Sequence, residues 1–179
     1  GIVHDRGFSA VARIAFTFDG CRTRFLFRLE ADVVVRVGEA DAVFFQQLYG
    51  QVSAGPFELT AGRKERTTGE GFEPLSLGSM LISQNAAPIT QVSIAWPEFV
   101  TVPYTMDFLA VRGYLGHGWV EGDRVVNEPF LHEKYLYLRI GKPAWPIEAR
   151  AGILHYAMWG GNPVKTGLGA SLPSGFSDF

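Results

Sequence analysis

The chain has 179 residues, a length that usually forms one domain, and its formal net charge of −2 gives no electrostatic reason to expect a nucleic-acid partner. Its single cysteine excludes an internal disulfide and a cysteine cluster for a metal, so we expect Cys21 to be a small residue of a turn. No apolar run approaches the ~20 residues that a transmembrane helix needs. Generous glycine and aromatic content, with only 19% charged residues, is typical of strand-rich membrane barrels.

Alternation of apolar and polar residues dominates the N-terminal part of the chain. It begins in residues 8–18, and a turn at Asp19-Gly20 could join this segment to the next one as a hairpin. Between Arg24 and Val37 one face is entirely apolar, and five of the seven residues on the other face are charged. Strands of soluble sandwiches usually have ~5–6 residues, whereas a membrane strand needs ~9–11. This long segment therefore favours a barrel strand with an apolar face toward lipid and charges toward a wet lumen.

Further strand-like segments follow in chain order, separated by short turns. In the third segment, Phe44 and Leu48 are expected on one face and Gln47 and Tyr49 on the other. The Thr67–Pro88 stretch is rich in Gly, Ser and Pro and indicates a long irregular excursion that could fold inward or cap one end. The segments after residue 37 are 41–53, 57–66, 89–102, 107–120, 133–140 and 148–159. The pattern predicts an all-β, antiparallel up-and-down meander of about eight or nine strands.

The two ends of the chain suggest that it is a piece of something longer. Residues 1–5 contain neither an initiator methionine nor a signal-peptide pattern, and residues 171–179 have a loop composition. We therefore expect residues 1–179 to be a single fragment, about half of a large transmembrane β-barrel, which alone would form an open curved sheet. Aromatic residues near the expected strand ends suit either the interfacial girdles of such a barrel or ordinary packing. They are Trp96, Tyr104, Trp119, Phe130, Trp145 and Trp159.

No motif of an enzyme or of a metal site stands out. The four histidines show no metal-ligand spacing, the serines lack a nucleophile elbow, and residues 69–72 lack the ending of a phosphate-binding loop. Glu30 and Asp32 could serve glycoside hydrolysis, but between Arg28 and Arg36 they suit a charge ladder along a lumen better. We therefore expect a protein that is not an enzyme and that has neither cofactor nor metal.

Four ordered motifs, together with Gly62-Arg63-Lys64, resemble the capsule assembly Wzi family. The motifs are Leu75–Pro88, Gly113–Trp119, Leu131–Leu136 and His155–Gly161, and the resemblance spans roughly residues 55–163. It implies an outer-membrane β-barrel of roughly eighteen strands. It also implies a lectin-like protein that attaches or organises capsular polysaccharide or exopolysaccharide at the cell surface, with outer-membrane lipid as its second partner. A second hypothesis is a porin-like channel for small polar solutes, because a charged lumen suits both roles. A third is a soluble β-sandwich or glycan-active enzyme.

A polysaccharide ligand directs attention to aromatic and polar residues near the expected strand ends. Sugars bind with a C–H face on an aromatic ring and their hydroxyls on planar polar groups, and an acidic capsule would add a preference for Arg and Lys. An equal alternative to sugar binding is that the tryptophans belong to a membrane girdle and that the basic residues are solvated in the lumen. The sequence does not show which end of the barrel faces outside. The candidate ligand-binding residues are Arg63, Lys64, Asn85, His117, Trp119, His132, His155 and Trp159.

Overall fold

The computed structural model describes residues 10–22, 24–37, 42–66, 87–120, 126–142 and 144–163. Most of them lie in β-strands, and the rest lie in the connections between strands. Within these ranges no helix is long and apolar enough to cross a membrane. The strands are β1 (Ala10–Arg22), β2 (Phe25–Val37), β3 (Ala42–Ala54), β4 (Phe57–Arg63), β5 (Thr90–Thr101), β6 (Leu109–Trp119), β7 (Val126–Asn127), β8 (Phe130–Ile140), β9 (Ala149–Trp159) and β10 (Asn162–Pro163).

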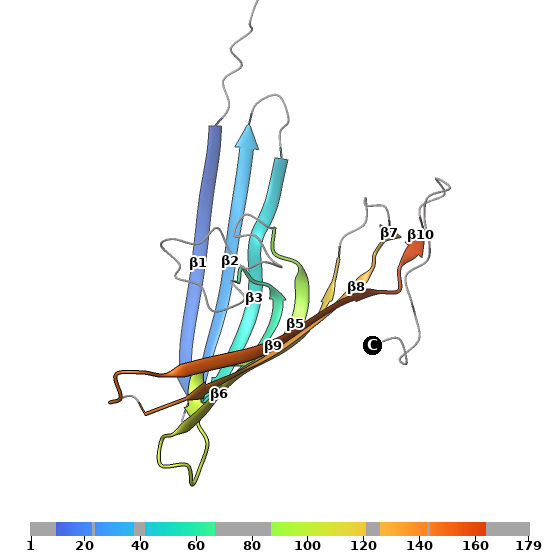
Figure 1. The fold of residues 1–179 in the computed structure, drawn as a ribbon. Helices are drawn as coiled ribbons and strands as arrows, with labels where there is room; N and C mark the ends of the chain where they lie inside the picture. The colour runs from blue at the N-terminus through green and yellow to red at the C-terminus, as the bar shows by residue number, and fades with distance from the viewer. Residues whose placement is uncertain are drawn as a thin grey trace, which may run out of the picture.

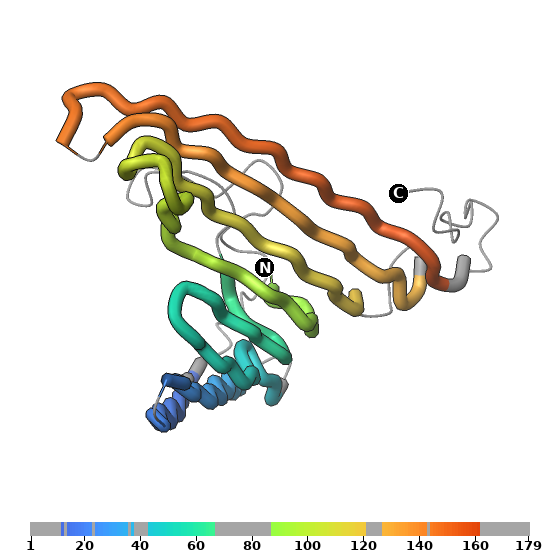
Figure 2. The backbone as a smooth tube through the Cα atoms, turned by 90° about the horizontal axis from the view of Figure 1, so that it is seen from below, coloured from blue at the N-terminus to red at the C-terminus, as the bar shows by residue number. Residues whose placement is uncertain are grey.

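Eight strands form one antiparallel sheet in the order β1-β2-β3-β4-β5-β6-β8-β9, while the short β7 and β10 pair with each other. Each strand of the large sheet therefore lies beside its neighbours along the chain, apart from the small β7, and the predicted meander is confirmed. β1 to β3 stand steeply, whereas β6, β8 and β9 run at a large angle to them (Figure 1). Seen from below, the sheet opens as a curved single layer (Figure 2). This open, twisted sheet is the form expected of part of a large barrel.

The predicted turn at Asp19-Gly20 is wrong. Both residues belong to β1 and pair with Arg28 and Phe27, so the tight turn follows between Arg22 and Phe25. The reason is a cross-strand ion pair, in which the Arg28 guanidinium donates to the Asp19 carboxylate over 2.8 Å and favours continued pairing. Cys21 therefore lies in a strand rather than in the predicted turn, and its side chain is an exposed free thiol.

The predicted faces of the third segment are partly wrong because of a β-bulge. The register shifts between Asp32 and Val33, so that Asp32 opposes Gln47 while Val33 opposes Phe45. Phe45 therefore shares a face with Leu48, in place of Phe44, since an extra residue in one strand reverses the alternation beyond it.

Several strand ends also differ from the prediction. β4 ends at Arg63, three residues early, and β8 begins three residues before the predicted start at Glu133. In β5 the register becomes irregular between Trp96 and Val100, where Pro97 cannot donate a ladder hydrogen bond. Most of the predicted excursion, residues 67–86, lies outside the described residues.

The two faces of the sheet have opposite chemistry. The outer face, which bears Phe25, Phe27 and Leu29, exposes 49%, 40% and 58% of these side chains. The inner face, on the Arg28 and Asp32 side of β2, is where polar groups are buried. Soluble domains bury apolar side chains and expose charged ones, and this sheet does the reverse. Phe25 and Phe27 thus face away from any packed core, as the barrel interpretation requires. The buried polar residues are Asp32, Gln51, Thr60, Gln91, Ser93 and Glu133.

At three places an aromatic side chain packs directly against a glycine. Each glycine makes room for the aromatic side chain because it has no Cβ atom. A Cβ atom added there would approach the nearest atom of the aromatic side chain to 2.3–2.5 Å, well inside van der Waals contact. Tyr137 is the cross-strand partner of Gly152, and its ring packs against the glycine backbone. The three pairs are Trp96 on Gly113, Tyr114 on Gly116 and Tyr137 on Gly152.

We expect Gly152→Ala to lower the free energy of unfolding by about 1–3 kcal/mol, because the new methyl group must displace the Tyr137 ring. Gly20→Ala is the matched control within a strand, since its nearest ring atom is 3.6 Å away. Urea unfolding of the intact protein in lipid vesicles measures both. Equal losses of unfolding free energy in the two variants would contradict this explanation, because only Gly152 is covered closely by a ring.

Candidate functional site

The predicted ligand-binding residues divide between the two faces of the sheet. Lys64, which directly follows β4, makes its contacts with inner-face residues, and Asn85 lies outside the described residues. The remaining six belong to the outer face by register with the apolar positions of their strands. They are Arg63, His117, Trp119, His132, His155 and Trp159. Their proposed contact with sugar stays a prediction, but it concerns mainly the outside of the sheet.

The His117 ring lies at the centre of an aromatic group on the outer face. Its centroid is 5.3 Å from that of Trp119, 5.6 Å from that of Phe130 and 5.9 Å from that of Trp159. The His132 ring follows at 6.4 Å. β6, β8 and β9 bring these rings together, because Trp119, Phe130 and Trp159 are cross-strand partners in one row. Side chains on one row of one face touch.

Two further basic positions continue this group along the strands. His155 lies 6.4 Å from His132 between ring centroids, and Lys134 is its direct cross-strand partner. Sequence reasoning missed Lys134 and Phe130, although their spacing of two residues from His132 places all three on one face. We call the whole set the outer cluster: His117, Trp119, Phe130, His132, Lys134, His155 and Trp159.

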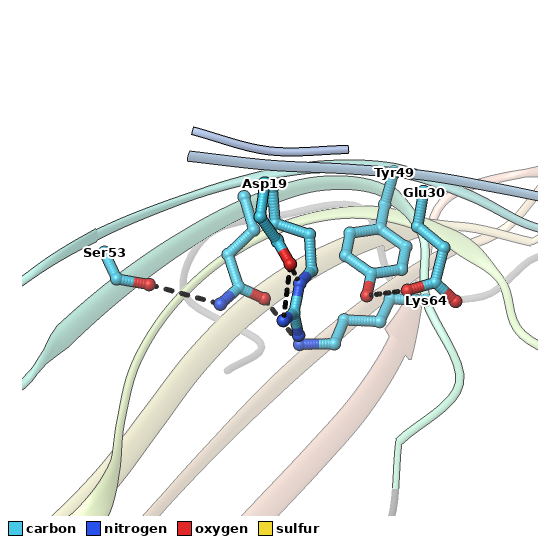
Figure 3. A network of polar contacts seen from close by, with 7 residues as sticks. Asp19, Glu30, Tyr49, Ser53 and Lys64 are labelled. Carbon is cyan, nitrogen blue, oxygen red and sulfur yellow. Dashed lines mark hydrogen bonds and ion pairs between the residues drawn. The ribbon is translucent and has the colours of Figure 1, made fainter. Parts of the chain in front are cut away.

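The inner face carries a chain of polar contacts across β2, β3 and β4, lying together beneath the arch of the strands (Figure 3). The Tyr49 hydroxyl donates to Glu30 at 2.7 Å, and the Lys64 ammonium donates to Gln51 at 2.6 Å while lying 5.2 Å from the centre of the Tyr49 ring. Glu30 thus has a hydrogen-bonding partner on the inner face, as the charge-ladder interpretation of Glu30 and Asp32 expects.

Arg66 forms a buried polar contact on the inner face. Its guanidinium donates to Gln91, to the Tyr114 hydroxyl and to the Glu133 carboxylate, so it joins β5, β6 and β8. The side chains of Arg66 and Glu133 are only 18% and 2% exposed. Sequence reasoning missed this pair, because Arg66 and Glu133 are 67 residues apart in the chain.

Three arginines surround the Phe99 ring on the inner face. The guanidinium carbons of Arg112, Arg139 and Arg150 lie 5.6, 5.3 and 5.4 Å from its centroid. Arg150 also pairs with the Glu148 carboxylate. We call these three arginines and Phe99 the arginine cluster. Cation–π contacts favour this arrangement, and the cluster presents a concentrated positive charge beside the rings of Tyr135 and Tyr137.

Metal binding has no visible basis in the part of the chain that the structure describes. No group of three or more His, Cys, Asp or Glu side chains there could hold an ion, and this includes the histidines of the outer cluster. The chemistry on offer is recognition by rings, guanidinium groups and imidazoles.

An open antiparallel meander with an apolar outer face and a polar, aromatic inner face is consistent with part of a β-barrel that has a polar interior. The family model of capsule assembly protein Wzi matches residues 1–178. The chain therefore belongs to the capsule assembly Wzi family, which confirms the resemblance seen in its motifs and assigns it a role in capsule assembly. No curated protein and no solved structure matches it significantly.

Proposed function

We propose that this chain forms part of an outer-membrane barrel that binds acidic surface polysaccharide, without catalysis, during capsule assembly. Membership of the Wzi family supports the capsule role. The exposed apolar outer face supports the membrane position, because such a face is stable against lipid and costly against water. The arginine cluster is the observation that favours an acidic glycan over a neutral one.

The lengths of the connections support one orientation of the proposed barrel. Residues 64–89 join β4 to β5 at one end of the sheet, whereas β1–β2 and β3–β4 are joined at the other end by two residues each, 23–24 and 55–56. Bacterial barrels have short periplasmic turns and longer extracellular loops. This comparison supports an orientation in which the end of the sheet that carries Arg63 faces the outside of the cell. Exposed Tyr104 and Trp145, in connections at the opposite end, would form the periplasmic girdle.

Arginine and tyrosine side chains offer the two contacts that an acidic sugar needs. A guanidinium binds a carboxylate through two parallel N–H···O bonds, and three guanidinium groups gather around Phe99, where Arg150 pairs with Glu148. The Tyr135 ring next to Arg112 provides a flat surface for the C–H face of a sugar.

We expect the double variant Arg112→Gln, Arg139→Gln to bind acidic capsular polysaccharide at least about tenfold more weakly than the wild type, because two charge-assisted contacts are lost. The assay is binding of purified polysaccharide to the intact protein in lipid nanodiscs. Arg28→Gln is the matched control, since it removes an inner-face charge that is paired with Asp19 far from the arginine cluster. Unchanged binding in the double variant would refute the proposed site.

A porin-like channel would use the same inner face differently. In that case the double variant would alter the anion selectivity of conductance in planar bilayers and leave the amount of capsule held on the cell unchanged. The proposed binding role predicts the opposite pair of results, with less capsule on the cell and more in the medium.

A further inference from the structure

The basic groups of the outer cluster face away from the inner surface, at the border of the apolar outer face. On β4 the apolar positions Phe57, Leu59 and Ala61 end at Arg63, and on β9 the apolar run that includes Ile153 ends at His155. None of the described outer-face positions on β4, β6, β8 and β9 is acidic. The charge of this surface is therefore positive and has no carboxylate beside it on these strands.

The border between apolar and basic residues crosses the strands obliquely. The row of cross-strand partners that starts at Arg63 reaches β9 at Trp159, but the border on β9 lies at His155, four residues away after four strand steps. One residue per strand, with a rise of ~3.3 Å and a strand spacing of ~4.8 Å, corresponds to a strand tilt of about 35°. Membrane barrels have this tilt, so the oblique border is level with the membrane plane.

The position of the cluster at this border decides which groups it can meet. Leu136 and Ile153 lie one row below Lys134 and His155 on the outer face and are exposed, as they would be at the depth of acyl chains. Trp119 and Trp159 lie above, at the depth where indole rings meet headgroups. Lys134 and the imidazoles lie between these layers, at the depth of lipid phosphates. In the described part of the chain, the buried Nδ1 atom of His155 has no hydrogen-bond partner.

We propose that the outer cluster is a binding site for the phosphate-bearing headgroup of an anionic membrane lipid. Lys134 supplies the charge, the three histidines supply hydrogen bonds to phosphate oxygens, and the tryptophan rings cover the headgroup. A basic group near a membrane surface attracts anionic lipid. This site lies on the opposite face of the sheet from the arginine cluster, so the test of lipid binding is independent of polysaccharide binding.

The test is native mass spectrometry of the intact protein released from nanodiscs that hold equal amounts of phosphatidylglycerol and phosphatidylcholine. We expect wild-type protein to retain the anionic lipid preferentially. Lys134→Gln should reduce this preference about fivefold, while Lys134→Arg should keep it. Arg28→Gln, which removes an equal charge from the inner face, should have no effect.

Three results would overturn the proposal. One is equal retention of both lipids by the wild type, and another is an equal loss of preference in Lys134→Gln and Arg28→Gln. The third is displacement of the anionic lipid by millimolar inorganic phosphate, which would assign the cluster to free phosphate. Heat-modified migration on gels confirms that each variant is folded before the measurement.

Discussion

Replacing Arg66 with Met is expected to lower the free energy of unfolding by about 3–5 kcal/mol, the largest effect of any single change considered. The substitution leaves the carboxylate of Glu133, which is 2% exposed, without its cation on the inner face. Gln91 and Tyr114 lose a hydrogen-bond donor in the same step. Chemical unfolding of the intact protein in lipid vesicles measures the loss.

A double-mutant cycle separates the ion pair from general packing. Glu133→Leu combined with Arg66→Met removes both charges, and we expect the double variant to be more stable than either single variant. If the two single losses simply add in the double variant, Arg66 and Glu133 do not stabilise the sheet through each other.

Val33→Arg is expected to cost about 2–4 kcal/mol in a bilayer, because it places a guanidinium on the outer face near the membrane midplane. The apolar outer positions of β2 run from Phe25 to Val37, and Val33 lies next to the centre of that run. Arg28→Val, on the inner face, should cost only about 0.2–1 kcal/mol, since its ion pair with Asp19 is exposed to solvent. The measurement is again unfolding from lipid vesicles.

Equal tolerance of Val33→Arg and Arg28→Val would contradict the assignment of the faces. A second outcome would also contradict it. If the protein were monomeric and soluble without detergent, and Val33→Arg destabilised it there, the apolar face would pack against protein rather than lipid.

Alternation along β2 predicted the architecture because it is a local property. Phe25 to Val37 repeats with a period of two, and this repeat alone requires a strand with unlike faces. The bulge at Asp32 and Val33 could not be predicted in the same way, since it depends on how β3 fits against β2. The same is true of Asp19, which is kept in β1 by a partner on the next strand.

The candidate site was predictable by residue type and not by position. Sugar chemistry pointed to His117, His132 and His155, and the structure does bring their rings together. Whether they would converge depended on the register of β6, β8 and β9, which residues far apart in the chain determine together. Arg66 and Glu133 left no local signal, because two isolated charges look like solvated residues until the strands between them are paired.

The central claim is that the outer face of this sheet contacts lipid and the inner face lines a wet lumen. Spin labels at Leu29→Cys and Thr17→Cys, in a Cys21→Ser background, test it in the reconstituted protein, since Leu29 is on the outer face and Thr17, paired with Glu30, is on the inner one. We predict that the label at position 29 collides mainly with oxygen dissolved in lipid and that the label at position 17 collides mainly with a water-soluble nickel chelate. Equal access of the nickel chelate to both labels would contradict the account.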